Sequence, residues 1–156
     1  MPPLPVIAIV IPVFNEEAVL PALFARLSAI FGAQPALCAW RAVLVDDGSR
    51  DRSAVLIRDQ AAADPRFELV ELSRNFGFQA ALAAGLAYAR QADAIVTMDA
   101  DLQDPPEVIP QLLAAWRAGA EIVRATRRTR AETGLRRVGF NVFHGVFGRL
   151  SDFPMS

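Results

Sequence analysis

An uninterrupted run of apolar, mostly β-branched residues from Val6 to Ile11 constrains the fold of this chain more than any other feature. A strand without a polar break is covered on both faces, as in a parallel sheet. Pro12 follows the run and is expected to end the strand. The next segment, 16–31, places apolar residues at the spacing of one helical face. The chain therefore begins with a buried strand that leads into a helix.

The same alternation continues along the chain. We predict further strands at 42–45, 67–72, 94–98 and 122–125, and further helices at 53–63, 79–90 and 105–118. Strands that alternate with helices of this length form a parallel sheet with right-handed crossovers. The predicted fold class is therefore α/β, with a Rossmann-like, mostly parallel sheet flanked by helices in a single domain.

The character of the sequence changes after Thr126. The segment becomes rich in arginine, and apolar and aromatic residues then recur at helical spacing over 135–150. We expect a ligand-binding core over 1–130 and an amphipathic Arg- and Phe-rich segment over 131–156. The length of 156 residues, of which 53% are hydrophobic, suits one compact core.

Charge is unevenly distributed along the chain. The net charge is −1, yet the segment from Arg117 to Leu150 has eight arginines and two acidic residues, which leaves +6 there and −7 elsewhere. The near-zero total argues against nucleic acid as a partner, and the asymmetry favours an anionic partner near the C-terminal end. Cys38 is the only cysteine, so an internal disulfide is excluded and a reducing, cytosolic environment is expected. The N-terminal apolar run lacks a basic region and is interrupted by proline, so neither a signal peptide nor a membrane span is predicted.

Polar residues follow each of the first four predicted strands. In open parallel sheets, ligands bind beyond the carboxyl ends of the strands, so we expect these residues to share one cleft. In chain order they are Asn15, Glu16 and Glu17; Asp46, Asp47, Gly48, Ser49 and Asp51; Ser73, Arg74, Asn75 and Gly77; Asp99, Asp101, Gln103 and Asp104.

The pair Asp99 and Asp101 carries the most specific chemistry. Two carboxylates separated by one residue, just past a strand, can hold a hard divalent cation such as Mg2+ or Mn2+, and Gln103 offers a third oxygen. Such a cation would relieve the repulsion within the acidic cluster and neutralise a diphosphate. Helix capping is the alternative interpretation, and it suits Asp104 in particular, because Asp104 precedes two prolines.

The other strand ends allow both functional and structural interpretations. Asp46 and Asp47 can accept hydrogen bonds from a ribose or a base, whereas Ser49 and Asp51 suit a turn and a helix cap. Residues 15–17 alone are typical of a helix start. Arg74 can position a phosphate, brace the acidic loop or be a solvated ion-pair partner.

Taken in order, the motifs IPVFNEE, LVDDGSRD, LSRNFG and MDADLQDP resemble those of the family 2 glycosyltransferases with the GT-A fold. Within that family the sequence is most similar to polyprenyl-phosphate and dolichyl-phosphate glycosyltransferases, the group that includes bactoprenol glucosyl transferases and dolichyl-phosphate mannose synthases. The similarity extends from Val6 to about Pro154.

The resemblance implies a role for each strand end. The nucleoside of a UDP- or GDP-sugar would contact Pro12, Phe14, Glu16, Asp46 and Asp47. Mg2+ or Mn2+ would be held on the donor diphosphate by Asp99, Asp101 and Gln103. Phosphate oxygens of donor or acceptor would contact Arg127 and Arg137.

The resemblance also implies the reaction and its setting. A hexose would pass from the donor to a polyprenyl phosphate with inversion at the anomeric carbon, assisted by Asp99, Asp101 and the metal; no general base is expected in this chain. The parent enzyme would lie at the cytoplasmic face of the cell membrane, where the Arg- and Phe-rich segment meets the surface.

The end of the sequence departs from the family pattern. Relatives continue into a Gly-Asp-Phe-type motif and usually into transmembrane helices, which are absent from this sequence, so we expect nucleotide binding with weak or no turnover. The exposed apolar face of the last helix suggests self-association, and the chain is a possible homo-oligomer. Three alternatives stay open: a non-catalytic nucleotide-sugar-binding module, a family 2 enzyme with a saccharide acceptor, and a phosphotransfer domain with an aspartyl nucleophile.

Overall fold

The computed structural model describes residues 3–33 and 38–126. The chain divides into two compact units, Met1–Glu121 and Ile122–Ser156. The helices and strands described below all belong to the first unit. They are β1 (Val6–Val13), α1 (Leu20–Ala33), β2 (Ala39–Asp46), α2 (Ser53–Ala63), β3 (Phe67–Glu71), α3 (Phe78–Tyr88), β4 (Ala94–Thr97), the 3-10 turn η1 (Pro106–Val108) and α4 (Ile109–Arg117).

The four strands form one sheet in the order β3-β2-β1-β4, and every pair of neighbours is parallel. The apolar run that opens the chain is therefore a central strand. Its residues Ile7 to Ile11 are fully buried, as a strand covered on both faces must be. The predicted α/β class and the alternation of strands and helices are confirmed.

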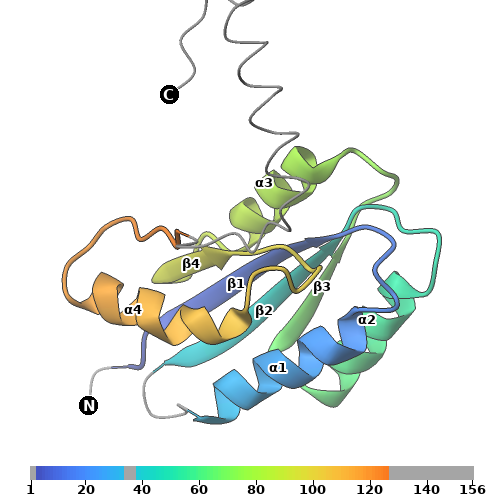
Figure 1. The fold of residues 1–156 in the computed structure, drawn as a ribbon. Coiled ribbons are helices and arrows are strands. Elements are labelled where there is room, and N and C mark those ends of the chain that lie inside the picture. Colours follow the sequence, from blue (N-terminus) through green and yellow to red (C-terminus); the bar gives the residue numbers. More distant parts are fainter. Residues whose placement is uncertain (1–2, 34–37, 127–156) are drawn as a thin grey trace, which may run out of the picture. The chain divides into compact units, whose positions relative to one another are not determined.

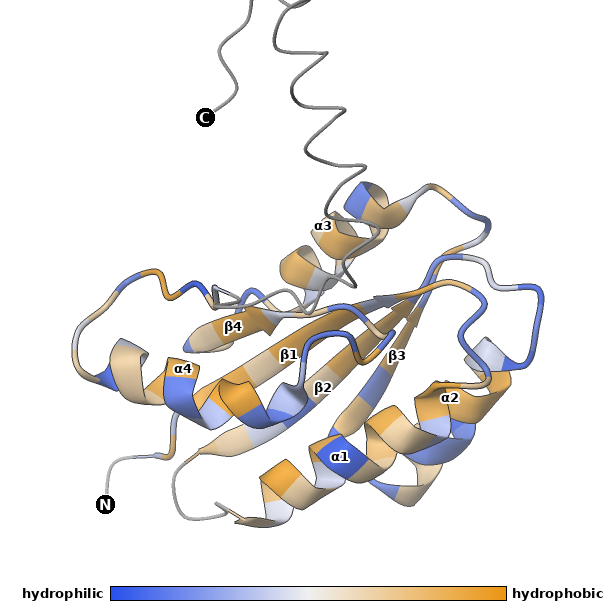
Figure 2. Cartoon of the chain, viewed as in Figure 1, coloured by the Kyte–Doolittle hydropathy of each residue, from blue (hydrophilic) through white to orange (hydrophobic). Residues whose placement is uncertain are grey.

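Helices cover both faces of the sheet (Figure 1). One face carries the larger core, in which Ile7, Ile9 and Ile11 pack with apolar residues of α1, α2 and α4. The alternate residues Ala8 and Val10 face α3 on the other side. Figure 2 shows the apolar strands in the middle of the unit and hydrophilic stretches in the loops that follow them. The loops at the strand ends are thus more polar than the central strands.

Helix α3 approaches the sheet through small residues. Ala81, Gly85 and Ala89 lie on its buried face at intervals of one helical turn. A Cβ atom at Gly85 would lie 2.4 Å from Cγ1 of Val10 and 2.9 Å from Cγ2 of Val45. The absence of a side chain at Gly85 therefore sets the distance between α3 and the sheet.

Pro12 does not end β1, as the sequence predicted; the strand continues to Val13. The carbonyl groups of Val6 and Val10 accept hydrogen bonds from the β4 side, while that of Val13 accepts one from the β2 side. By this alternation the missing N–H of Pro12 faces the β4 side, where the pairing of β1 with β4 ends at Val10 and Thr97. On its other side β1 still pairs with β2, so the strand continues past the proline to Val13.

The strand predicted at 122–125 is absent; residues 122–126 form no helix or strand. A β-branched segment becomes a strand only when a neighbouring strand satisfies its backbone groups. No strand of the described sheet pairs with it, and Ile122 is 90% exposed. The predicted division of the chain at residue 130 stays a prediction.

Candidate functional site

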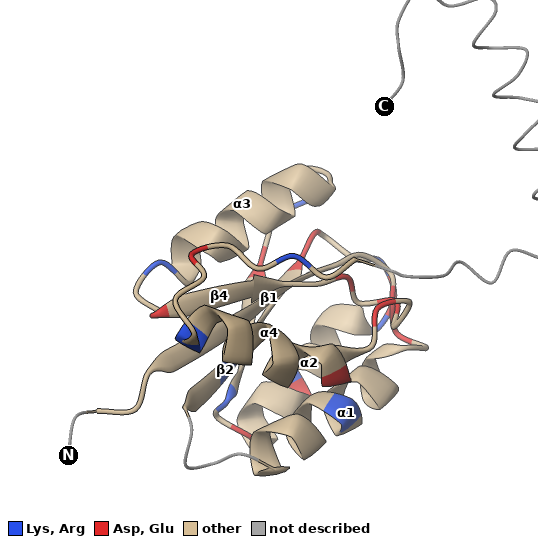
Figure 3. Ribbon diagram, turned by 60° about the vertical axis from the view of Figure 1, so that its left-hand side comes forward, with Lys and Arg blue, Asp and Glu red and all other residues tan. Residues whose placement is uncertain are grey.

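A cavity of about 300 Å3 lies at the carboxyl ends of β1, β2 and β4. Parallel strands direct their carboxyl ends to the same edge of the sheet, so loops that are distant in sequence meet there. Several acidic residues lie in these loops (Figure 3). The lining residues are Pro12, Val13, Phe14, Glu16, Asp47, Asn75, Gly77, Phe78, Ala81, Asp99, Ala100 and Asp101.

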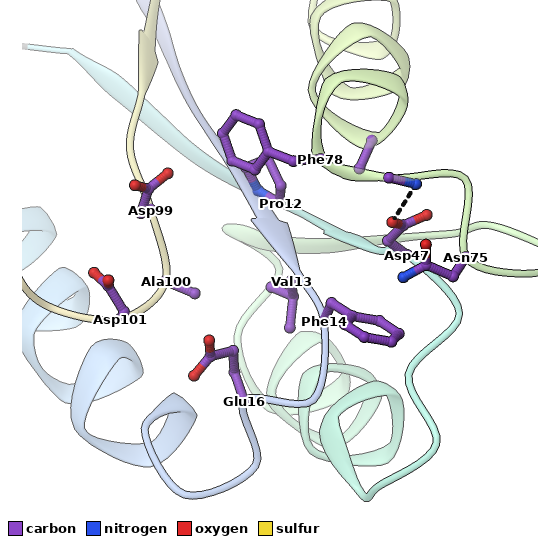
Figure 4. Close-up of a pocket in the computed structure, with 12 residues that line it drawn as sticks. Pro12, Val13, Phe14, Glu16, Asp47, Asn75, Phe78, Asp99, Ala100 and Asp101 are labelled. Carbon is purple, nitrogen blue, oxygen red and sulfur yellow. Dashed lines mark hydrogen bonds between the residues drawn. The ribbon is translucent and has the colours of Figure 1, made fainter. Parts of the chain in front are cut away.

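Asp99 and Asp101 form one side of the cavity, and Asp47 and Asn75 the other, as Figure 4 shows. Partial burial, together with the negative charges of Asp101 and Asp104, raises the pKa of Asp99 above its usual value. An acidic pair with this mutual repulsion favours a cationic ligand. Within the described ranges, however, no group of three or more His, Cys, Asp or Glu side chains is placed to hold a metal ion.

The loop after β4 places this acidic pair. Ala100, between the two aspartates, is buried in the core, so both flanking side chains are directed outward. Leu102 adopts a left-handed backbone conformation (φ 58°) and packs on the core. The Asp101 Oδ1 atom accepts a hydrogen bond from the backbone N–H of Gln103 at 3.0 Å. Its second oxygen has no hydrogen-bond partner among the described residues.

Asp46 and Asp47 are neighbours with different surroundings, and both are buried, with 1% and 3% of their surface exposed. Asp47 lines the cavity, and its two carboxylate oxygens accept the backbone N–H groups of Phe76 (2.7 Å) and Gly77 (2.9 Å). One oxygen of Asp46 accepts the N–H of Ser49 at 3.1 Å. The other, Oδ1, is buried without a hydrogen-bond partner among the described residues.

The residues after β1 close the remaining side of the cavity. Pro12 is buried beneath it, whereas the ring of Phe14 is 42% exposed. The half-buried Glu16 directs its carboxylate into the space below Val13 and Ala100 (Figure 4). No hydrogen bond or ion pair joins this carboxylate to another described side chain. Glu16 is therefore available to a ligand.

Not all of the predicted site residues reach the cavity. Six of them line it: Pro12, Phe14, Glu16, Asp47, Asp99 and Asp101. Asp46 lies behind it, next to Val13 in the register of β1 and β2. Gln103 and Arg74 are exposed and do not line it, and the Arg74 guanidinium lies 4.6 Å from the centre of the Phe76 ring. Arg127 and Arg137 lie outside the described residues.

Two further lining residues follow β3, and neither was assigned a role from the sequence. Asn75 was expected at the cleft because it follows a strand, and it lines the cavity. Phe78, half exposed at the start of α3, was not expected there. A phenyl ring has neither charge nor a metal-binding group, so residue chemistry alone did not single out Phe78.

The fold is that of GT-A glycosyltransferases. A solved structure with the same arrangement is a mannosyltransferase from Pyrobaculum calidifontis in complex with GDP-mannose and Mn2+, with a TM-score of 0.61. The two proteins are 24% identical, and the match covers 90% of this chain and 39% of the other. At this level of identity the likeness concerns the fold alone.

The chain belongs to glycosyl transferase family 2, whose sequence pattern matches residues 8–145. An undecaprenyl-phosphate 4-deoxy-4-formamido-L-arabinose transferase of Shewanella sediminis is 47% identical over 152 residues, which cover 96% of this chain and 45% of the relative. A bactoprenol glucosyl transferase of Shigella phage SfV is 38% identical over 146 residues, which cover 93% of this chain and 47% of the relative. The chain thus spans less than half the length of these relatives.

Proposed function

We propose that this chain is the donor-binding portion of a metal-dependent, inverting glycosyltransferase that transfers a hexose from a UDP- or GDP-sugar to a polyprenyl phosphate. The observation that carries the proposal is one cavity at the ends of parallel strands, with Asp99 and Asp101 on one side, Asp47 on the other and Glu16 below them (Figure 4). Family membership and the names of the lipid-phosphate sugar transferases among the relatives support it.

The nucleoside would bind on the side formed by the ends of β1 and β2. A buried carboxylate oxygen without a hydrogen bond is costly, and Asp46 Oδ1 is such an atom. Because Asp46 lies behind the cavity, an N–H group of a nucleobase would reach this oxygen only after a local rearrangement. Glu16 offers free acceptors for the ribose hydroxyls, and the exposed ring of Phe14 offers a surface on which a base can stack.

The donor diphosphate would bind at the acidic side. Mg2+ and Mn2+ bind through oxygen, and Mg2+ commonly uses one or two carboxylates together with substrate phosphates. Asp99 and Asp101 therefore fit as a pair, even though no cluster of three acidic ligands occurs in the described ranges. Gln103 would add an amide oxygen. When bound, the metal would neutralise charge on the departing diphosphate.

The transfer step needs little further catalytic assistance from the residues of the cavity. A phosphate acceptor is already an anion at neutral pH, so its attack on the anomeric carbon needs no strong general base. Attack opposite the leaving diphosphate inverts that carbon. The residues of the cavity would orient the donor for this displacement.

Three arginines, Arg74, Arg127 and Arg137, would supply cationic groups for phosphate oxygens. The Arg- and Phe-rich segment 131–156 would approach the membrane surface at its cytoplasmic face. None of the described helices has the length and apolar character to cross a membrane.

Calorimetric titration of UDP and GDP tests the proposal directly. We expect one of the two nucleotides to bind in the presence of Mn2+, and this binding to be lost in EDTA and in Asp101→Ala. Asp59→Ala serves as the matched control, because Asp59 is an exposed acidic residue of α2 away from the cavity. Binding of neither nucleotide by the folded chain would overturn the donor-site assignment.

A sugar-transfer assay distinguishes an enzyme from a non-catalytic binding module. A radiolabelled UDP- or GDP-sugar is incubated with undecaprenyl phosphate and either the chain alone or a version extended to the length of its relatives. We expect a lipid-linked sugar from the extended version and little or none from the chain alone. Product from a saccharide acceptor instead would favour a different branch of the family. Binding without transfer or donor hydrolysis by the extended protein would favour a non-catalytic module.

A further inference from the structure

The loops that follow β1 and β2 are joined by hydrogen bonds in both directions. Three consecutive backbone N–H groups of the first loop donate to side chains of the second. The N–H of Asn15 donates to Ser49 Oγ (3.0 Å), that of Glu16 to Ser53 Oγ (2.8 Å) and that of Glu17 to Asp51 Oδ2 (3.1 Å).

Two further hydrogen bonds run in the opposite direction, from backbone N–H groups of the second loop to side chains of the first. The N–H of Arg50 donates to Asn15 Oδ1 at 2.8 Å, and the N–H of Arg52 donates to Glu17 Oε2 at 2.9 Å. Each loop thus supplies both donors and acceptors to the other. A movement of either loop would break several of these bonds together. The bond between Glu16 and Ser53 is part-buried and the other four are exposed, so the loss of the Glu16 bond is the most costly.

Asn15 occupies a special backbone conformation within this set. Its φ of 56° lies in the left-handed region, where asparagine and aspartate are tolerated better than other residues with a side chain. This conformation turns the chain at the end of β1, and Phe14 and Glu16 on either side of it both line the cavity. Asparagine therefore combines a tight turn with an acceptor for the Arg50 N–H.

Glu16 is the residue that this arrangement fixes. Its N–H is bonded to Ser53, a fully buried residue, and its carbonyl accepts the N–H groups of Val19 and Leu20 at the start of α1. The backbone of Glu16 is thus fully bonded, while its carboxylate has no described partner and faces the cavity. These bonds fix the backbone from which the Glu16 side chain extends, so this part of the loop needs no further ordering when a ligand binds.

We propose that Asn15, Ser49 and Ser53 are positioning residues that join the two loops into one unit and hold the Glu16 carboxylate at the nucleoside side of the cavity. The role assigned to Glu16 rests on the proposed function; the joining of the loops does not. The three residues act through Glu16 and make no contact with the reacting atoms.

A set of conservative variants isolates the hydrogen bonds. Asn15→Gly keeps the left-handed turn but removes the acceptor, whereas Asn15→Asp keeps both. Ser53→Ala removes the acceptor for the Glu16 N–H, together with the side-chain hydrogen bond of Ser53 to Asp51. Ser28→Ala, on the neighbouring helix α1, is the matched control, because Ser28 makes none of these bonds.

Two measurements are made on each variant of the 156-residue chain. Amide hydrogen exchange reports on the joining of the loops without any ligand. Titration with Mn2+ and UDP or GDP, compared with titration with Mn2+ and pyrophosphate, reports on the nucleoside side separately from the phosphate side.

We expect the Arg50 amide in Asn15→Gly, and the Glu16 amide in Ser53→Ala, to exchange about tenfold faster. Nucleotide affinity should fall about tenfold in both variants, with pyrophosphate affinity unchanged and with Asn15→Asp and Ser28→Ala behaving as wild type. Unchanged exchange, or an equal loss of nucleotide and pyrophosphate affinity, would overturn the proposal. If the wild-type chain binds no nucleotide, the proposed function fails, and faster exchange in Asn15→Gly that is restored in Asn15→Asp would still establish the joining of the loops.

Discussion

The carboxylate of Asp47 accepts a hydrogen bond from the backbone N–H of Gly77, thirty positions later in the chain. Gly77 is the residue that precedes α3, and the first N–H groups of a helix have no partner within the helix. A buried side chain at the end of β2 therefore caps a helix that begins after β3. This contact ties the nucleoside side of the cavity to α3.

Replacing Asp47 by asparagine should destabilise the fold. One oxygen would remain for the N–H groups of Phe76 and Gly77, and the new amide NH2 would face the other donor. We expect the free energy of unfolding to fall by about 2 kcal/mol, as for a buried donor left without a partner. Urea denaturation measures the change, and Asp59→Asn on α2 is the exposed control. A midpoint equal to that of wild type would show that the cap contributes nothing.

Gly48 should not tolerate a side chain. Its φ is 68°, and a Cβ atom there would lie 2.5 Å from the carbonyl carbon of Arg74 and 2.6 Å from the nitrogen of Asn75. Because these are backbone atoms, the loop after β3 would have to move. We expect Gly48→Ala to lose about 3 kcal/mol of stability, from left-handed strain and overlap together.

Gly119 provides the control for this substitution. It also has a positive φ, of 103°, but no atom lies within 4 Å of its Cβ position. Gly119→Ala should therefore show the effect of the backbone conformation without the overlap. Equal losses in thermal denaturation of the two variants would mean that the contact with Arg74 and Asn75 is unimportant.

Gly85 sets the spacing of α3 over the sheet, so an added methyl group should push the helix away. We expect Gly85→Ala to lose about 1 to 2 kcal/mol, because overlap with Val10 and Val45 outweighs the gain in helix propensity. Gly32→Ala in α1 is the matched control: its Cβ position is open, so its stability should equal or exceed that of wild type. The substitution Val10→Ala should restore part of the loss at Gly85 if the contact is its cause.

The ion pair of Arg41 and Glu68 should make stability depend on acid pH. The hydrogen bond from Arg41 lowers the pKa of Glu68 below its usual value. A carboxyl group with a lowered pKa in the folded state stabilises the fold above its unfolded pKa, and this contribution is lost as the pH falls through the folded-state pKa. Glu68→Gln should therefore be less stable than wild type by about 1 kcal/mol at pH 7, with the difference shrinking as the pH falls.

Glu71→Gln on the same strand is the comparison for Glu68. Glu71 pairs with Arg58, but both side chains are more than half exposed, at 51% and 57%. Exposed ion pairs contribute little, so this variant should match wild type at every pH. A constant difference between Glu68→Gln and wild type from pH 7 to pH 3 would contradict the assigned cause.

Local patterns in the sequence were sufficient for the architecture and for most of the cavity. Apolar periodicity located four strands and the helices between them, because burial on one or both faces is recorded in the spacing of apolar residues. The rule that ligands bind beyond the ends of parallel strands then located Glu16, Asp47, Asp99 and Asp101 around one cavity. Their roles in binding a donor stay predictions.

Other features depend on contacts between residues distant in the sequence, and local patterns could not predict them. A strand at 122–125 needed a partner, and Pro12 stayed within β1 because β4 ends before it; both depend on neighbouring strands. Asp46 and Asp47 look alike in sequence, yet only the folded chain brings Phe76 and Gly77 to Asp47 and leaves an oxygen of Asp46 unbonded. Hydrogen bonds between distant loops depend on direction and distance in space. The sequence by itself therefore determined most of the residues that gather at the cavity, and the fold decided which of the predicted residues reach it and which remain free to bind.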